Sequence, residues 1–196
     1  MKRSNPTASV SVILAAGLLL GCEAGDQRME GDMPLSPQPT IAVAVLHGQA
    51  GSDVSGTVTF TQEGEQVRIA AHVTGAPAGT LGFHLHEYGD CTAADFTSTG
   101  GHFNPTGVDH GAPTDPVHHA GDFGNITIGE DGVGHLELTT SMLTVHEGPF
   151  SVLGRAVILH AGTDDMHTQP TGDAGGRIGC GVVGRAQGAA GPQAGY

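Results

Sequence analysis

Residues 82–122 carry an unusual concentration of metal-binding side chains, which constrains the fold more than any other stretch of the chain. Six of the twelve histidines lie in these forty-one residues, and the carboxylate of Asp122 closes the run. Imidazole is a common ligand of zinc and copper, and aspartate can complete a zinc tetrahedron. An ordinary core or a solvated surface has no reason to gather so many imidazoles. The stretch therefore predicts a metal site.

Composition and periodicity both favour an all-β fold. The chain has 33 glycines, 11 prolines and only 4% aromatic residues, and strand-like runs alternate with glycine-rich turns. Single strands are predicted at residues 41–48, 55–62, 66–75, 83–87, 155–160 and 177–184. Residues 125–138 are predicted to form a hairpin with its turn at 130–132. The first three runs are expected to form an antiparallel meander with one buried face.

Two long irregular loops are predicted, at residues 89–122 and 161–176. Loops longer than about 12–15 residues are uncommon unless they are functional or disordered, and metal ligation would order the first one. Just before it, the period-two geometry of a strand places His84 and His86 on the same side. We therefore predict an eight-stranded antiparallel Greek-key barrel or sandwich with two long functional loops.

The first residues have the features of an export signal. Lys2 and Arg3 precede an apolar core at 10–20, which is too short for a membrane span of roughly 20 residues. The Leu-Leu-Gly-Cys ending resembles a bacterial lipoprotein signal, in which Cys22 is lipidated and becomes the first mature residue; an ordinary cleaved secretory signal is the alternative. Either signal predicts an exported protein of the cell envelope or periplasm, held to a membrane only through a lipid on Cys22.

The rest of the chain divides by composition. We expect a lipoprotein-type signal peptide at 1–21, a flexible tether at 22–40 with three prolines and no apolar period, one folded domain at 41–185, and a disordered tail rich in glycine, alanine and glutamine at 186–196.

Charge and cysteine content exclude some partners. Removal of residues 1–21 would take away Lys2 and Arg3, change the formal net charge from −13 to −15 and leave no lysine. This balance argues against nucleic acid and anionic membrane surfaces as partners. If Cys22 carries a lipid, Cys91 and Cys180 remain as a pair. In an oxidising compartment, closing that loop would stabilise the fold by roughly 4–5 kcal/mol.

Four motifs in the domain, taken in order, resemble the copper–zinc superoxide dismutases. They are GFHLHEYGD at 82–90, GGHFNP at 100–105, HAGDFGN at 119–125 and GDAGGRIGCGVVG at 172–184. A lone His-x-His would be a weak signal, but the four motifs together are highly specific. The resemblance covers roughly residues 41–185.

The resemblance implies a role for each matching residue. The copper ligands would be His84, His86, His102 and His160, and the zinc ligands would be His102, His110, His119 and Asp122. Asp164 matches the carboxylate that hydrogen-bonds one ligand histidine on each metal. Cys91 and Cys180 match the family's intrasubunit disulfide, and Arg177 matches the arginine that guides the anionic substrate to the copper.

The implied activity is dismutation of superoxide to dioxygen and hydrogen peroxide. Copper would cycle by one electron, which zinc cannot do, and His102 would bridge the two ions and deliver a proton. Such an enzyme would protect the cell envelope from superoxide. The resemblance also allows a homodimer, although the sequence does not specify its interface.

Two other functions are compatible with parts of this pattern. A non-catalytic module for copper or zinc storage is the main alternative, but it would not require Arg177 or a full copper ligand set. A copper-only relative would lack His110, His119 and Asp122. The remaining histidines are expected at the surface or partly buried: His47, His72, His118, His135, His146 and His167. For His167, in the second loop, a weak accessory contact to a metal is the alternative.

The second loop, AGTDDMHTQPTGDAGG, has no lysine, whereas many members of the resembling family carry lysines there that help to steer the substrate. We therefore predict slower and less salt-sensitive capture of superoxide. At physiological salt the Debye length is about 8 Å, so distant carboxylates are largely screened and the groups beside the metal should dominate.

Overall fold

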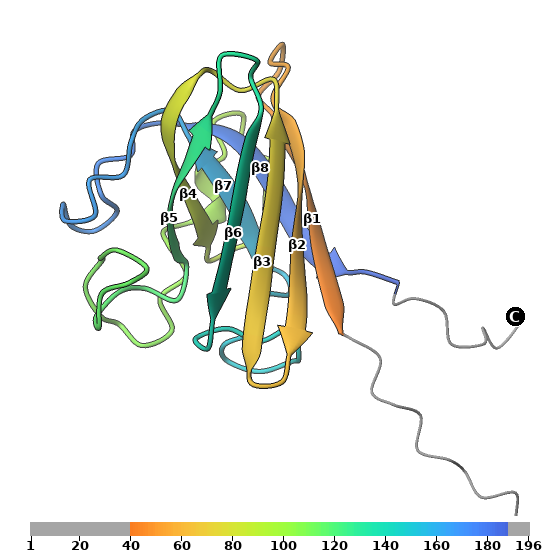
Figure 1. Cartoon of the computed structure of the whole chain (residues 1–196), viewed down its shortest axis with the longest axis vertical. Coiled ribbons are helices and arrows are strands. Elements are labelled where there is room, and N and C mark those ends of the chain that lie inside the picture. Colours follow the sequence, from red (N-terminus) through yellow and green to blue (C-terminus); the bar gives the residue numbers. More distant parts are fainter. Residues whose placement is uncertain (1–39, 188–196) are drawn as a thin grey trace, which may run out of the picture. The chain divides into compact units, whose positions relative to one another are not determined.

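Residues 40–187 are described by a computed structural model and contain eight β-strands (Figure 1). Their bounds are β1 Ile41–Gly48, β2 Ser55–Glu63, β3 Gln66–Thr74, β4 Gly79–His86, β5 Asp122–Ile128, β6 Gly134–Thr140, β7 Ala156–His160 and β8 Arg177–Arg185, with one short 3-10 helix, η1, at Thr97–Thr99. No helix among these residues is long and apolar enough to cross a membrane. The predicted signal peptide, Cys22, the tether up to residue 39 and the tail from residue 188 lie outside the described residues.

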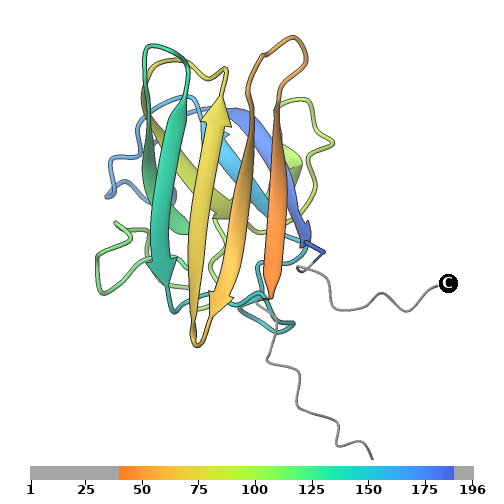
Figure 2. The same cartoon turned by 45° about the vertical axis from the view of Figure 1, so that its right-hand side comes forward.

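The strands close into an antiparallel barrel in the order β1-β2-β3-β6-β5-β4-β7-β8. Consecutive strands form the predicted meander β1–β2–β3, after which β3 pairs with β6, and β4 pairs with both β5 and β7. These crossovers are of the Greek-key kind. Figure 2 shows β1, β2, β3 and β6 side by side on the near face of the barrel. The predicted fold class is confirmed.

The core follows from the alternation of buried and exposed side chains along these strands. In β3, for example, every second residue from Val67 to Val73 is buried, while Arg68, Ala70 and His72 between them are partly or fully exposed. Phe60, Phe83 and Phe123 meet inside the barrel, with ring centroids 6.3 and 6.4 Å from that of Phe123. Burying one such side chain contributes about 1.5–3 kcal/mol, so the barrel is a rigid frame for the loops that it carries.

Two strands begin earlier than the pattern predicts. β4 begins at Gly79 rather than Phe83, because its register with β5 extends from Gly79 opposite Ile128 despite two glycines that lower its intrinsic strand preference. β5 begins at Asp122, which pairs with His84. Asp122 is therefore the first residue of a strand, although hydrogen bonds also join it to the preceding loop.

Three segments that carry the predicted ligands are tied together by a closed set of backbone hydrogen bonds. The amide of Leu85 donates to Gly121 (2.9 Å), the amide of Phe103 donates to Leu85 (2.8 Å), and the amide of Gly121 donates to Phe103 (3.0 Å). Each of these residues is a chain neighbour of at least one of His84, His86, His102 and Asp122. These backbone hydrogen bonds therefore fix the spacing of the three segments that carry the ligands.

We expect Gly121→Ala to destabilise the fold, because a Cβ at this position would overlap the carbonyl oxygen of Leu85. Overpacking of this kind costs about 1–3 kcal/mol. The matched control is Gly101→Ala in the same loop, where a Cβ meets no atom within 4 Å. Thermal unfolding of both variants measures the effect, and equal midpoints would contradict the proposed importance of the close approach.

Candidate metal centre

Two clusters of potential metal ligands lie against each other and share one residue, His102. The first contains four imidazoles and the second contains three imidazoles and a carboxylate: His84, His86, His102 and His160 in one, and His102, His110, His119 and Asp122 in the other. Within each cluster the ligand atoms lie within 4.8 Å of one another, and every member is buried. Strands β4, β5 and β7 supply four of these residues, and the loop between β4 and β5 supplies the other three.

In the four-histidine cluster, hydrogen bonds anchor the outer ring nitrogens of His84, His86 and His160. His86 Nδ1 donates to the carbonyl of Gly100 (3.0 Å), and His160 Nδ1 donates to that of Gly175 (3.2 Å). His84 Nε2 donates to Asp164 (2.8 Å). These bonds turn the opposite nitrogens inward, so that the Nε2 atoms of His86 and His160 lie 3.3 Å apart.

The second cluster converges on Asp122. The distances from its carboxylate oxygens are 2.7 Å to His102 Nδ1, 3.0 Å to His110 Nδ1 and 3.2 Å to His119 Nδ1. His102 therefore presents Nδ1 to this cluster and Nε2 to the other. The outer nitrogens of His110 and His119 are held by Asp164 (3.0 Å) and by the carbonyl of Val108 (3.1 Å).

Four buried ring nitrogens make no well-directed hydrogen bond among residues 40–187, although two of them, those of His110 and His119, lie close to the Asp122 carboxylate: His84 Nδ1, His102 Nε2, His110 Nδ1 and His119 Nδ1. Buried polar atoms are normally paired, since leaving one unpaired costs free energy. All four face the inside of a cluster. A metal ion in each cluster would satisfy them, and the two donor sets, four imidazoles and three imidazoles with a carboxylate, suit copper and zinc respectively.

Asp164 connects the two clusters from outside. Its two carboxylate oxygens accept hydrogen bonds from His84 and His110, one histidine of each cluster. Asn125 holds the backbone of Asp164 through two bonds, of 2.8 and 2.9 Å. Gln169 holds the backbone of His110 in the same way, with both bonds at 2.9 Å. We did not predict Asn125 or Gln169; Asn125 lies in the HAGDFGN motif, but no sequence signal distinguishes Gln169.

The two clusters differ in their affinity for protons. Burial lowers the pKa of His84 to about 3 and that of His160 to about 4, and it also keeps the pKa of His86 well below its usual value. Burial acts in the same direction on His110, but the two carboxylates that contact this ring, Asp122 and Asp164, outweigh it and raise its pKa to about 9. The four-histidine cluster is thus neutral at pH 7, while His110 holds an extra proton.

The carboxylates show the complementary effect. Burial opposes ionisation of Asp122 and Asp164, but hydrogen bonds from the surrounding histidines depress the pKa of both carboxyl groups well below the usual range. Both therefore stay ionised at neutral pH and supply buried negative charge to the centre.

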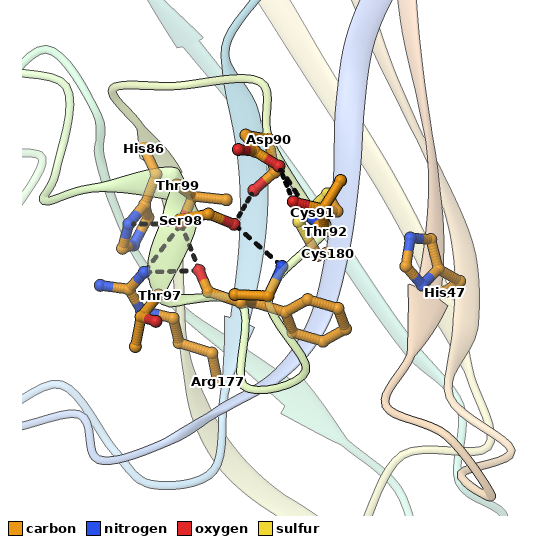
Figure 3. Close-up of a disulfide and its surroundings, with 12 residues drawn as sticks. His47, His86, Asp90, Cys91, Thr92, Thr97, Ser98, Thr99, Arg177 and Cys180 are labelled. Carbon is orange, nitrogen blue, oxygen red and sulfur yellow. Dashed lines mark hydrogen bonds between the residues drawn. A yellow bond between two sulfur atoms is a disulfide. The ribbon is translucent and has the colours of Figure 1, made fainter.

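Arg177 lies beside the four-histidine cluster and is held by the disulfide-linked loop (Figure 3). Its guanidinium donates to the carbonyls of Phe96 (2.7 Å) and Gly100 (2.7 Å) and to the hydroxyl of Thr99 (2.8 Å). Gly100 also accepts the bond from His86, so one carbonyl connects the arginine to a cluster histidine. Thr99 is fully buried, and the sequence did not single it out.

The Cys91–Cys180 disulfide is present in the structure and joins this loop to β8, with Cα atoms 6.0 Å apart. Its surroundings include Phe96, Ala156 and Ile158, all buried. The arginine at the start of β8 and the loop that binds it are therefore covalently connected as well as hydrogen-bonded.

The other histidines stay outside the two clusters, as expected. His118 is half-buried and donates to the carbonyl of Asp115 (2.8 Å). The remaining five are exposed: His47, His72, His135, His146 and His167.

Comparison with known proteins identifies the family of this chain. The family model described as copper/zinc superoxide dismutase matches residues 54–183, more than half of the chain. A solved structure titled as that of the clock protein EA4 is 39% identical, covers 76% of this chain and 97% of its own, and has a TM-score of 0.68. The chain belongs to the copper/zinc superoxide dismutase family.

Proposed function

We propose that this protein dismutates superoxide to dioxygen and hydrogen peroxide at the paired clusters. The observation that carries the proposal is His102, which turns one ring nitrogen to each cluster while its side chain remains fully buried. A storage module needs buried ligands, but it does not need one imidazole shared between two chemically different sites, nor an arginine held beside one of them.

The donor sets suggest which ion each cluster holds. Copper would be bound by His84, His86, His102 and His160, and zinc by His102, His110, His119 and Asp122. When bound, copper supplies one-electron oxidation and reduction, whereas zinc has no redox chemistry and fixes the ligand geometry.

The residues of the chain would bind the substrate and move protons. Arg177 remains cationic and half-buried beside His86, where it would attract and orient the superoxide anion. His102 would take up a proton at Nε2 while Nδ1 stays engaged in the second cluster, and would then release it toward the peroxide product. Two superoxide anions and two protons thus yield one dioxygen and one hydrogen peroxide.

The cellular setting is part of the same proposal. We propose an exported protein of the cell envelope, attached to a membrane through lipidated Cys22, that removes superoxide there and can associate as a homodimer. The Cys91–Cys180 disulfide supports an oxidising compartment, where such bonds persist. Mass spectrometry of the purified protein for a lipid on Cys22 would test the anchor.

The decisive test is superoxide dismutation by the full chain loaded with copper and zinc, compared with His160→Gln. Loss of one ligand should lower turnover by more than about 100-fold, since even residues that only support a ligand are worth 10–100-fold. His146→Gln, at an exposed histidine outside both clusters, is the control. If the fully loaded, disulfide-bonded parent is inactive, the metal-storage alternative replaces this proposal.

We expect capture of superoxide to depend weakly on salt. Arg177 is the cation beside the cluster, the second loop has no lysine, and the chain carries a formal charge of −13. Added salt therefore weakens both the attraction of superoxide by Arg177 and its repulsion by the net negative charge of the chain, and the two effects on the capture rate oppose each other. The measurement is kcat/KM between low and physiological ionic strength, and a steep fall would argue for long-range steering that these charges do not provide.

Metal uptake should respond to pH differently in the two clusters. A metal must displace the extra proton of His110, so binding to the three-histidine cluster should strengthen as the pH rises to about 9 and then level off. Burial lowers the pKa of all four rings in the other cluster, to about 3 for His84 and about 4 for His160, so the affinity of that cluster should change little between pH 6 and 8.

His86→Gln disables only the four-histidine cluster and His119→Gln only the other, which gives a matched pair for this measurement. Zinc affinity of the first variant and copper affinity of the second can be measured by competition with a chelator at pH 6.5, 7.5 and 8.5. Equal pH slopes in the two variants would refute the assigned proton on His110.

A further inference from the structure

A second pair of histidines lies on the outer surface of the barrel, away from the buried clusters. His72 on β3 and His135 on β6 are direct cross-strand partners, and both are exposed. Their rings stack, with centroids 4.6 Å apart and an interplanar angle of 20°. Figure 2 shows β3 and β6 side by side along the near face of the barrel. The pairing joins residues 63 positions apart in sequence.

The ring nitrogens of this pair have no other role in the structure. Among residues 40–187, neither ring takes part in a hydrogen bond or an ion pair, whereas His47 contacts Phe96 and His118 is bonded to Asp115. Stacking of two exposed rings contributes at most modestly, and two protonated rings at this distance would repel each other. The pair is therefore available to a ligand that prefers neutral imidazole.

We propose that His72 and His135 form a surface site for a divalent transition metal such as Cu²⁺ or Zn²⁺. Imidazole nitrogens bind these ions at about 2.0–2.1 Å, which places two nitrogens on one ion about 3 Å apart. The rings are stacked with centroids 4.6 Å apart, so they must tilt out of the stack to aim one nitrogen each at a common ion, which rotation about their side-chain torsions can do without movement of the strands. The sheet register has already brought the two ligands together, so the ion need not order the backbone.

The charged side chains around Glu137 favour a cation, because two carboxylates share a single guanidinium. Glu137 follows two residues after His135 on the same face of β6, and its side chain is 67% exposed. The nearby Arg68 is shared between two carboxylates, with Glu63 at 3.0 Å and Glu137 at 3.2 Å. Thr57, on β2 opposite His72, completes a polar rim. Water would fill the remaining coordination positions.

The inference is independent of the proposed enzyme activity. His72 and His135 belong to neither buried cluster. The site would take ions of the copper and zinc class in the order of imidazole affinity, Cu²⁺ above Zn²⁺, and it would not take Mg²⁺, which prefers oxygen ligands.

The experiment uses the full chain with both buried clusters already loaded with copper and zinc. CuCl₂ is titrated into the parent, into His72→Gln, into His135→Gln and into the control His146→Gln, and bound copper is counted by equilibrium dialysis. Parent and control should bind one further ion. In each pair variant, loss of one of two linked ligands should weaken binding of that ion by about a hundredfold.

A second measurement locates the ion. In ¹H–¹⁵N spectra, paramagnetic Cu²⁺ should broaden the amide signals around His72 and His135 first, and Thr57 and Glu137 with them, and Mg²⁺ should leave them unchanged. The proposal is overturned if either pair variant binds the further ion as tightly as the parent, or if broadening centres elsewhere on the chain. Thermal unfolding checks that the exposed substitutions leave the barrel folded.

Discussion

The centre of this structure depends on two buried carboxylates and the histidines that surround them. Asp122 and Asp164 are almost completely removed from solvent, and an unpaired buried charge would cost several kcal/mol. Each is instead surrounded by imidazole nitrogens at 2.7–3.2 Å, and His110 contacts both. The histidines in turn are oriented by these bonds. The same contacts therefore both neutralise the buried carboxylates and orient the ligand histidines.

The barrel makes this arrangement rigid. Residues of β4, β5 and β7 belong to a sheet with a packed core, and the closed backbone hydrogen bonds of Leu85, Phe103 and Gly121 extend the sheet order into the loop that carries His102. Preorganised ligands lose little conformational entropy when they bind. The disulfide extends the same rigidity to Arg177, whose three hydrogen-bond acceptors all lie between Phe96 and Gly100.

Much of the fold and the centre could be predicted from the sequence, and the exceptions have physical causes. Alternation along residues 41–75 predicted the meander because side chains of a strand face two sides in turn. The early start of β4 was missed because its glycines have weak strand preference, which cross-strand pairing with β5 overrides. The sequence did not reveal the roles of Asn125, Gln169 and Thr99, because their hydrogen bonds reach residues 13 to 78 positions away in the chain.

The sequence by itself determined the chemical types of the ligands, their order along the chain and the all-β pattern, since these are properties of residues and local periodicity. Only the tertiary structure decided which nitrogen of each imidazole faces inward, because that depends on partners such as Gly100 and Gly175 that the fold brings close. It also decided that His72 and His135 lie opposite each other, because the pairing of β3 with β6 skips two intervening strands. Register between distant strands comes from packing of the whole barrel and is not written in any local pattern.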